Sequence, residues 1–338
     1  MASNPRRMTL VVLAATLCAA SFLNYWQYSK DFYMPGFATY PAGWMAVIKG
    51  TAYAPEQYRV GVVQTAYWLS QHLHMGIRHA LGLLDAISVL VAAFLLYGLL
   101  ERSAIYRNAT LAVKWFGSAA FVLLVQFYMA WLLWYQRPET LPMTMLVALL
   151  LWLWTRKKIW LDESVLGRLI TGGLIFLVTL AQALVRADVA FMLNVGVFIV
   201  CLTRFGKGLA LPRSAATLSS LMGVVLAGSV QLYMMKVAYP LTTYGGTSPF
   251  ALKLNIFTPH RWPPFVLFIL PFVWLLVQIA RHRFTGNAAN LAFTVGGLLF
   301  AGVWVVIGKI DEVRIFLPFA IVLVPLTVQM AMQRLDGV

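Results

Sequence analysis

The feature that most constrains this chain is a series of continuous apolar runs, most of them long enough to cross a lipid bilayer. A transmembrane helix needs about 20 mostly apolar residues for a hydrocarbon core about 30 Å thick. The chain is 61% hydrophobic and 11% charged, which is about half the charge of a typical soluble domain. The sequence therefore predicts an all-α fold, a polytopic transmembrane helical bundle that forms a single integral membrane domain over residues 1–338. The predicted spans number about ten, roughly 8–26, 80–100, 111–134, 140–155, 168–185, 189–203, 214–234, 263–280, 288–308 and 315–331.

The distribution of lysine and arginine predicts the orientation of these spans. With a cytoplasmic N-terminus, the inner segments hold 15 Lys and Arg, and the outer segments hold 11 over much longer loops. This arrangement obeys the positive-inside rule and places both termini in the cytoplasm, with the protein in the plasma (inner) membrane. Acidic residues contribute little to membrane topology, yet more of them are predicted on the outer side than on the inner side. This bias indicates that the functional site lies on the outer face. The predicted outer acids are Asp31, Glu56, Glu139, Asp188, Asp311 and Glu312.

The remaining composition excludes several classes of function. The net charge of +15 is scattered over short loop clusters, so no compact basic domain exists to bind nucleic acid. Cys18 and Cys201 both lie inside apolar runs, which supports neither a disulfide framework nor a zinc site.

Two long outer loops, 27–79 and 235–262, are predicted to carry the function, because long ordered loops are usually functional. The second half of the first loop, about 57–78, reads as an amphipathic helix lying at the membrane interface. Its apolar face comprises Val62, Val63, Ala66, Leu69, Leu73 and Ile77, and its polar stripe comprises Gln64, Gln71, His74 and Arg78. A helix of this kind either contributes to a site or only seals the outer edge of the bundle.

Asp31 is the candidate catalytic carboxylate. It lies a few residues beyond the first span, among the aromatic residues of "NYWQYSKDFYMPG". One interpretation is a solvated charge neutralised by Lys30. The other is a carboxylate in an aromatic, partly desolvated cleft, where burial raises its pKa towards the range of a general base.

Basic residues in the other outer segments are candidate phosphate ligands. Four charged residues precede the last predicted span: Lys309, Asp311, Glu312 and Arg314. Arg314 either forms an ion pair with a neighbouring acid or binds a phosphate. His260 and Arg261 end the second long loop, and Arg59 lies in the first. The Gly- and Thr-rich stretch "LTTYGGTSPF" is a candidate mobile flap.

Three further residues are secondary candidates. Asp188 forms, with Arg186, a self-neutralising pair in a tight outer turn between two spans. Asp85 is the acid inside a predicted span, where an ionisable group is either functional or snorkels to the surface. His74 shares the first loop with two other histidines, but no carboxylate follows at helical spacing to complete a metal site, so no metal is predicted there.

This layout resembles the GT-C superfamily of polytopic glycosyltransferases, which use polyprenyl-phosphate-linked sugars. The similarity lies in one span followed by a long outer loop with an early acid, Asp31, then a juxtamembrane amphipathic helix, many spans and a late outer loop. The segment "DEVRIFLPFAIVLVP" is similar to the pattern of acid, arginine, apolar residues and proline that begins a late span in several bacterial members. This chain departs from the family in having no acidic doublet in the first loop, no soluble C-terminal domain and a small size.

The resemblance implies a transferase that moves a sugar from a polyprenyl-phosphate-linked donor to an envelope glycan, lipid or protein acceptor. Asp31 would be the base, and Arg314, Arg261, His260 or Arg59 would hold the phosphate. The expected partners are that lipid-linked sugar and membrane lipid, and a divalent cation stays open as a cofactor. The alternatives are a non-catalytic binder or transporter of a lipid-linked glycan or other amphiphile, and another envelope transferase such as a polymerase, ligase or acyltransferase.

Overall fold

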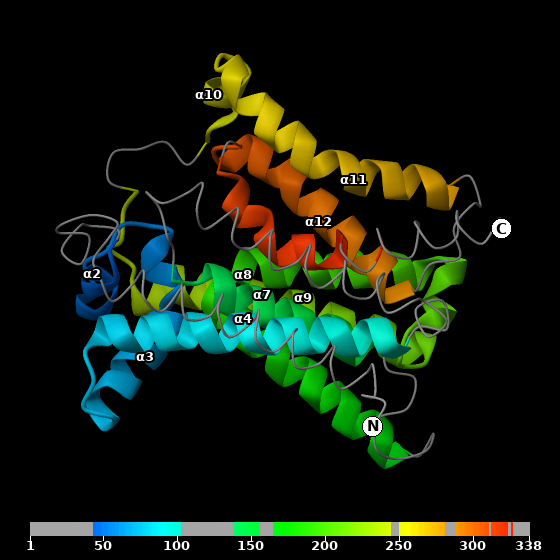
Figure 1. Cartoon of the computed structure of the whole chain (residues 1–338), viewed down its shortest axis with the longest axis horizontal. Helices are drawn as coiled ribbons and strands as arrows, with labels where there is room; N and C mark the ends of the chain where they lie inside the picture. The colour runs from blue at the N-terminus through cyan, green and yellow to red at the C-terminus, as the bar shows by residue number, and fades with distance from the viewer. Residues whose placement is uncertain are drawn as a thin grey trace, which may run out of the picture.

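The computed structural model of the chain describes residues 43–102, 138–155, 165–244, 250–280, 288–310, 312–323 and 326. The described part is all-helical, with no strand among these residues. Figure 1 shows long helices running in a common direction with short helices at one end. The α-helices are α2 (Trp44–Lys49), α3 (Val60–His72), α4 (Ile77–Arg102), α7 (Thr140–Thr155), α8 (Val165–Leu202), α9 (Arg213–Tyr233), α10 (Leu252–Ile256), α11 (Trp262–Ala280) and α12 (Ala288–Ile307).

Short segments of other helical types join these elements. The 3₁₀ turns are η1 (Glu56–Tyr58), η2 (Arg204–Gly208), η4 (Pro259–Arg261) and η5 (Val313–Phe316), and a π-helical segment, η3 (Met234–Ala238), follows α9 directly. Four of the described helices are long and apolar enough to cross a membrane: Ile77–Leu99, Val165–Leu202, Arg213–Ala238 and Ala288–Ile307. The predicted all-α membrane fold is therefore confirmed at this coarse level. The predicted spans 8–26 and 111–134 lie outside the described residues.

Helix α8 has a break at Arg186 that divides it into two segments. A straight helix of its 38 residues would measure about 57 Å, far more than a hydrocarbon core of about 30 Å. The backbone of Arg186 is non-helical, with φ −155° and ψ 91°. The break coincides with the turn that the sequence predicts between the runs 168–185 and 189–203, because an Arg and an Asp interrupt an otherwise apolar stretch.

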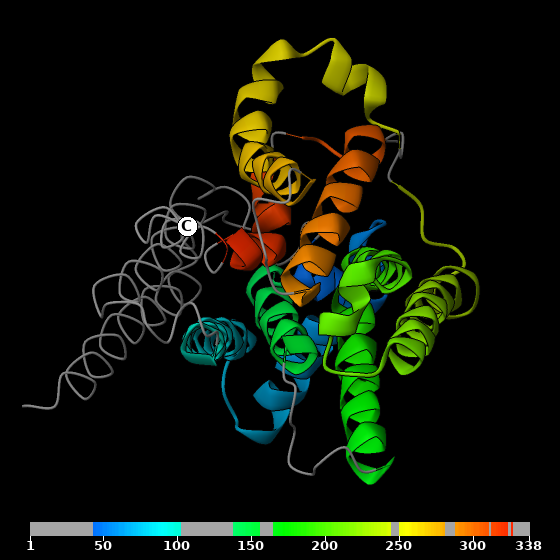
Figure 2. The ribbon, with the colours of Figure 1, turned by 90° about the vertical axis from the view of Figure 1, so that its right-hand side faces the viewer.

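Contacts between helix termini define two ends of the bundle. At one end, Arg186 donates to the carbonyl of Ile315 after α12, and Arg59 pairs with Glu139 before α7 and with Asp188 after the break in α8. At the opposite end, the Ala210 amide donates to the carbonyl of Trp154 at 3.0 Å, and Gly208 lies beside Ala288. Helices α7 and α12 and the second segment of α8 therefore run between these ends. Figure 2 views the bundle along the helices, with α4 and α9 on either side of this group.

The helix predicted over about 57–78 is shorter than expected. Helix α3 ends at His72, and α4 begins at Ile77, so the single continuous helix was wrong. His74 has a φ of 51°, in the left-handed region, and this stops the helix. The buried face of α3 does include the predicted Val62, Val63 and Ala66, whereas Leu73 is exposed beyond the end of the helix.

Asp85 is 1% exposed, so its side chain does not snorkel to the surface. It lies in α4 within the apolar stretch Ile77–Leu99. The sequence placed it only about one turn from the membrane surface, which left snorkelling open as an alternative. Helix packing, which a single sequence does not show, buries this carboxylate.

Helices α8 and α12 cross at backbone distance through small residues. A Cβ added to Gly196 would lie 2.6 Å from the amide nitrogen of Gly296, and a Cβ added to Gly296 would lie 2.8 Å from the carbonyl oxygen of Met192. Such close approach of helices, through small residues at the crossing, is typical of membrane bundles.

Replacing Gly196 by alanine is expected to destabilise the protein by about 1–3 kcal/mol, the usual cost of overpacking. The methyl group meets the backbone of α12, which cannot move without shifting the whole helix. The matched control is Gly172→Ala on the same helix, where an added Cβ meets nothing within 4 Å. Thermal unfolding of the purified protein in detergent measures both, and equal unfolding temperatures for the two variants would show that the crossing is looser than described.

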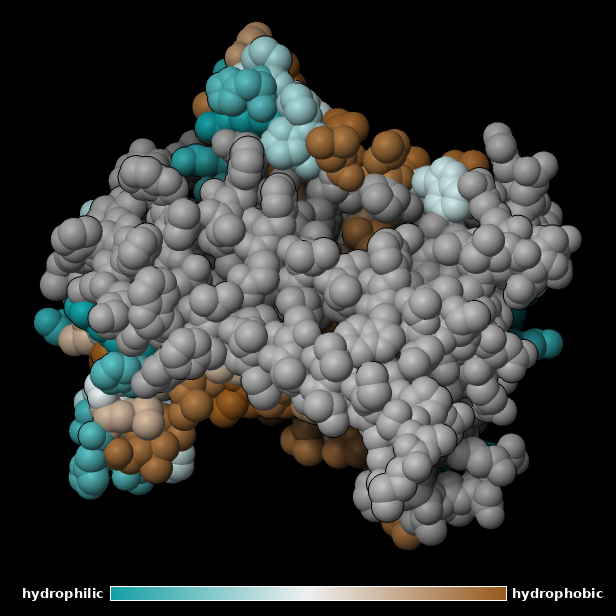
Figure 3. All heavy atoms as spheres, in the orientation of Figure 1, coloured by the Kyte–Doolittle hydropathy of each residue, from teal (hydrophilic) through white to brown (hydrophobic). Residues whose placement is uncertain are grey.

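The surface of α11 is strongly apolar. Figure 3 shows hydrophobic residues over this helix. The exposed apolar residues of α11 include Val266, Leu267, Leu270, Val273 and Val277. A helix with apolar side chains facing outward suits contact with lipid acyl chains.

Candidate functional site

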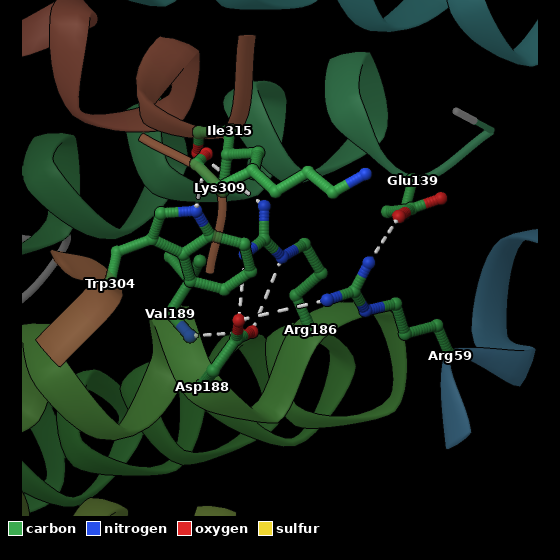
Figure 4. A network of polar contacts seen from close by, with 8 residues as sticks. All are labelled: Arg59, Glu139, Arg186, Asp188, Val189, Trp304, Lys309 and Ile315. Atoms are coloured by element: carbon green, nitrogen blue, oxygen red, sulfur yellow. Dashed lines mark hydrogen bonds and ion pairs between the residues drawn. The ribbon is translucent and has the colours of Figure 1, made fainter. Parts of the chain in front are cut away.

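An ionic network joins four charged side chains from three separate parts of the chain at one end of the bundle (Figure 4). Arg59 precedes α3, Glu139 precedes α7, and Arg186 and Asp188 lie at the break in α8. Both carboxylates stand at the beginning of a helical segment, where the partial positive charge of the peptide dipoles favours an anion. We call Arg59, Glu139, Arg186 and Asp188 the outer network, after its predicted side of the membrane, and the end of the bundle that carries it the network end.

Arg186 is the most constrained member of the outer network. Its Nη2 donates to Asp188 Oδ2 at 2.6 Å, its Nε donates to Asp188 Oδ1 at 3.2 Å, and its Nη1 donates to the carbonyl of Ile315 at 3.4 Å. Its guanidinium carbon lies 5.3 Å from the ring centre of Phe300 and 5.8 Å from that of Trp304. The side chain is 2% exposed, so this arginine holds α8, α12 and the segment after α12 together.

Arg59 links the two carboxylates of the outer network. Its Nη1 lies 2.8 Å from Glu139 Oε1, and its Nη2 lies 3.8 Å from Asp188 Oδ2. Burial by itself lowers the pKa of Arg59, but the neighbouring carboxylates of Glu139, Asp188 and Glu56 outweigh it and hold that pKa above its ordinary value. Arg59 therefore carries a positive charge at neutral pH.

Asp188 is the most accessible carboxylate of the outer network. Its side chain is 31% exposed, against 8% for Glu139. Its Oδ1 also accepts a hydrogen bond from the amide of Val189 at 3.0 Å. Because two arginines and an amide already stabilise its charge, this carboxylate is a weak base and is suited to positioning a bound group.

Lys309 adds an uncommitted positive charge beside the outer network. Its side chain is exposed and points toward the side of the network that carries Arg59 and Glu139 (Figure 4). None of the described carboxylates lies within ion-pair distance of its amine. Arginine pairs already engage Glu139 and Asp188, so the exposed Lys309 amine is the group here that can attract an anion.

The backbone of Lys309 is fixed from both sides. The Trp304 indole nitrogen donates to its carbonyl at 3.1 Å. The buried side chain of Asn255 donates to the carbonyl of Gly308 at 2.7 Å and accepts from the amide of Ile310 at 3.4 Å. The exposed lysine therefore projects from a rigid support.

The other predicted site residues fall in different places. His260 and Arg261 lie in η4, next to α11, and His260 is exposed. Glu312 and the backbone of Arg314 belong to the segment after α12 that also holds Ile315. His74 is exposed at the end of α3. Asp31 lies outside the described residues, as do the neighbouring aromatics.

The structure thus brings Arg59 and Asp188 together and adds residues that the sequence did not single out for the site. The sequence marks Glu139 in one way only, because it is the last charged residue before an apolar run. Arg186 and Lys309 were noted only as parts of local charge clusters. Their meeting depends on contacts between segments 80 and 129 residues apart, which periodicity does not reveal.

Among the described residues, no group of three or more His, Cys, Asp or Glu side chains is placed to hold a metal ion. Comparison of the chain with protein-family models, with curated proteins and with solved structures finds no match.

Proposed function

We propose that this chain is a membrane glycosyltransferase of GT-C type, which moves a sugar from a polyprenyl-phosphate-linked donor to an envelope glycan, lipid or protein. In this proposal about ten spans cross the plasma membrane, both termini are cytoplasmic and the outer network faces outward. The observation that carries the proposal is Lys309 at the network end, which is exposed and not paired with any described acid.

The geometry suits a phosphate group attached to a lipid. Lys309 supplies an ammonium group on an exposed side chain. Arg59 supplies a guanidinium that its contacts with Glu139, at 2.8 Å, and Asp188, at 3.8 Å, hold in place. Arg314 follows Lys309 by five residues and is a further candidate for the same phosphate. The apolar surfaces of the bundle give a polyprenyl chain access to this end from the membrane.

The transfer itself makes modest chemical demands. A glycosyl phosphate carries a good leaving group, so the protein must hold the phosphate, orient an acceptor hydroxyl and remove its proton. Neither Asp188 nor Glu139 is suited to remove the proton, because arginine neutralises both. We assign that role to Asp31, at the start of the first long loop, whose later part supplies Arg59.

One observation favours the alternative of a non-catalytic binder or transporter of a lipid-linked glycan. Both carboxylates of the outer network are engaged with arginine, so neither is suited to act as a base, and the exposed Lys309 can bind an anion without any chemistry. Such a protein would depend on Lys309 and be insensitive to the charge of Asp31.

Replacing Lys309 by methionine is expected to weaken the binding of polyprenyl phosphate by about ten-fold, since a lost hydrogen bond to a charged group costs about 1.5 kcal/mol or more. Binding is measured as retention of the lipid on the purified protein by native mass spectrometry. The matched control is Lys49→Met, an exposed lysine at the end of α2. Equal retention of polyprenyl phosphate by wild type and both variants would show that Lys309 does not bind the phosphate.

A further inference from the structure

A second surface feature lies beside α11 and is separate from the outer network. The segment from residue 250 to residue 262 contains α10 and η4 and exposes large apolar side chains beside basic ones. The exposed apolar residues are Phe250, Leu252, Leu254, Ile256 and Phe257, and Phe257 is 79% exposed. Figure 1 shows α10 projecting sideways from the end of α11, and Figure 3 shows hydrophilic residues there next to the hydrophobic surface over α11.

The fold holds this segment firmly in its exposed position. Asn255 is fully buried, and its Nδ2 donates to the carbonyls of Val305 at 2.8 Å and Gly308 at 2.7 Å. The Trp262 indole donates to the Asn255 carbonyl at 2.9 Å, and the Ala251 amide donates to Val306 at 2.8 Å. The apolar side chains therefore face outward because α10 is anchored to α12 in that orientation.

The charge of the segment is of one sign. It carries Lys253, His260 and Arg261, and no acidic residue occurs anywhere in the sequence between Asp188 and Asp311. Lys253 is exposed between the apolar neighbours Leu252 and Leu254. Exposed apolar side chains combined with basic ones are the composition of segments that lie in the interface of a membrane with anionic lipids.

We propose that residues 250–262 form an interfacial anchor that inserts Phe257 and its apolar neighbours into the leaflet at the network end. In this anchor the exposed Lys253 binds the phosphates of anionic phospholipids. The position supports this, because the segment leads directly into α11, whose exposed side chains suit contact with acyl chains. The proposal does not depend on the enzymatic function, since it concerns bulk membrane lipid and not the substrate.

The anchor also has a physical connection to the outer network. The Asn255 side chain contacts the carbonyl before Lys309 and the amide after it. One buried side chain therefore holds both the anchor and the backbone turn that presents the Lys309 amine.

Insertion is tested by a spin label at Phe257→Cys, with Cys18→Ser and Cys201→Ser to remove the native thiols, in nanodiscs of phosphatidylcholine. The label at 257 is expected to be more accessible to oxygen than to a water-soluble nickel complex. A label at Lys49→Cys, on the exposed end of α2, is expected to show the reverse. Nickel accessibility at 257 equal to that at 49 would overturn the anchor.

Lipid selectivity is tested by native mass spectrometry after exposure to equal amounts of phosphatidylglycerol and phosphatidylethanolamine. Wild type is expected to retain phosphatidylglycerol preferentially, and Lys253→Gln is expected to reduce that retention by about five-fold, the contribution of one basic residue at an anionic surface. Lys49→Gln is the charge-matched control and should leave retention unchanged. Equal retention of both lipids by wild type, or an unchanged Lys253→Gln variant, would overturn the anionic headgroup site.

Discussion

Replacing Asp31 by asparagine is expected to reduce sugar transfer by about 10²- to 10⁴-fold, the usual contribution of a general base. The change keeps the size of the side chain and removes its ability to take a proton from the acceptor hydroxyl. Binding of polyprenyl phosphate should stay within about two-fold of wild type, because the cations at the network end hold the phosphate in this account. The two quantities are measured on the same purified protein, as transfer from radiolabelled lipid-linked sugars and as lipid retention.

The matched control for Asp31→Asn is Glu56→Gln, which removes another acid from the same first loop. Glu56 lies in η1, near Arg59, so this variant tests whether any loss of negative charge in the loop stops transfer. The account requires Glu56→Gln to keep most of its activity. Full activity in Asp31→Asn would remove Asp31 as the base, whereas lipid retention without any transfer by wild type would leave the binder or transporter as the better description.

Replacing Arg186 by methionine is expected to destabilise the protein by about 3–5 kcal/mol, the cost of removing one partner from a buried ion pair. The variant loses both hydrogen bonds to Asp188, the bond to Ile315 and the contacts with Phe300 and Trp304. Equilibrium unfolding in mixed detergent measures the change in the free energy of unfolding.

A paired variant separates the ionic contribution of Arg186 from its packing. Arg186→Met combined with Asp188→Asn removes the carboxylate that the single change leaves without its arginine, so it should recover part of the lost stability. Arg186→Lys should lose stability as well, because an ammonium cannot donate to both oxygens of Asp188 in the same geometry. Wild-type stability in Arg186→Met would show that the network does not join these helices.

Parts of this architecture could be predicted because they depend on local patterns. Helical spacing of Val62, Val63 and Ala66 identified the buried face of α3, and the two charges at 186 and 188 marked the break in α8. In both cases the physical cause lies within a few residues of the effect. The count of about ten spans is a prediction of the same kind, and the described residues include four helices that are long and apolar enough to cross a membrane.

Other parts depend on contacts between distant segments and were not accessible in this way. The pairing of Arg59 with Glu139 joins residues 80 positions apart. The end of α3 at His72 depends on a left-handed residue, His74, although the apolar spacing continues to Ile77. Asp85 is buried by neighbouring helices, whereas its place in the sequence was compatible with exposure.

The most direct test of the account is photo-crosslinking of the purified wild-type protein with a polyprenyl phosphate that carries a diazirine next to the phosphate. The labelled peptides are identified by mass spectrometry. The account predicts labels in the segments around Arg59, Glu139 and Lys309, and competition by unmodified polyprenyl phosphate. Labels confined to the opposite end of the bundle, around residues 204–213, would contradict the claim that the network end holds the lipid-linked phosphate.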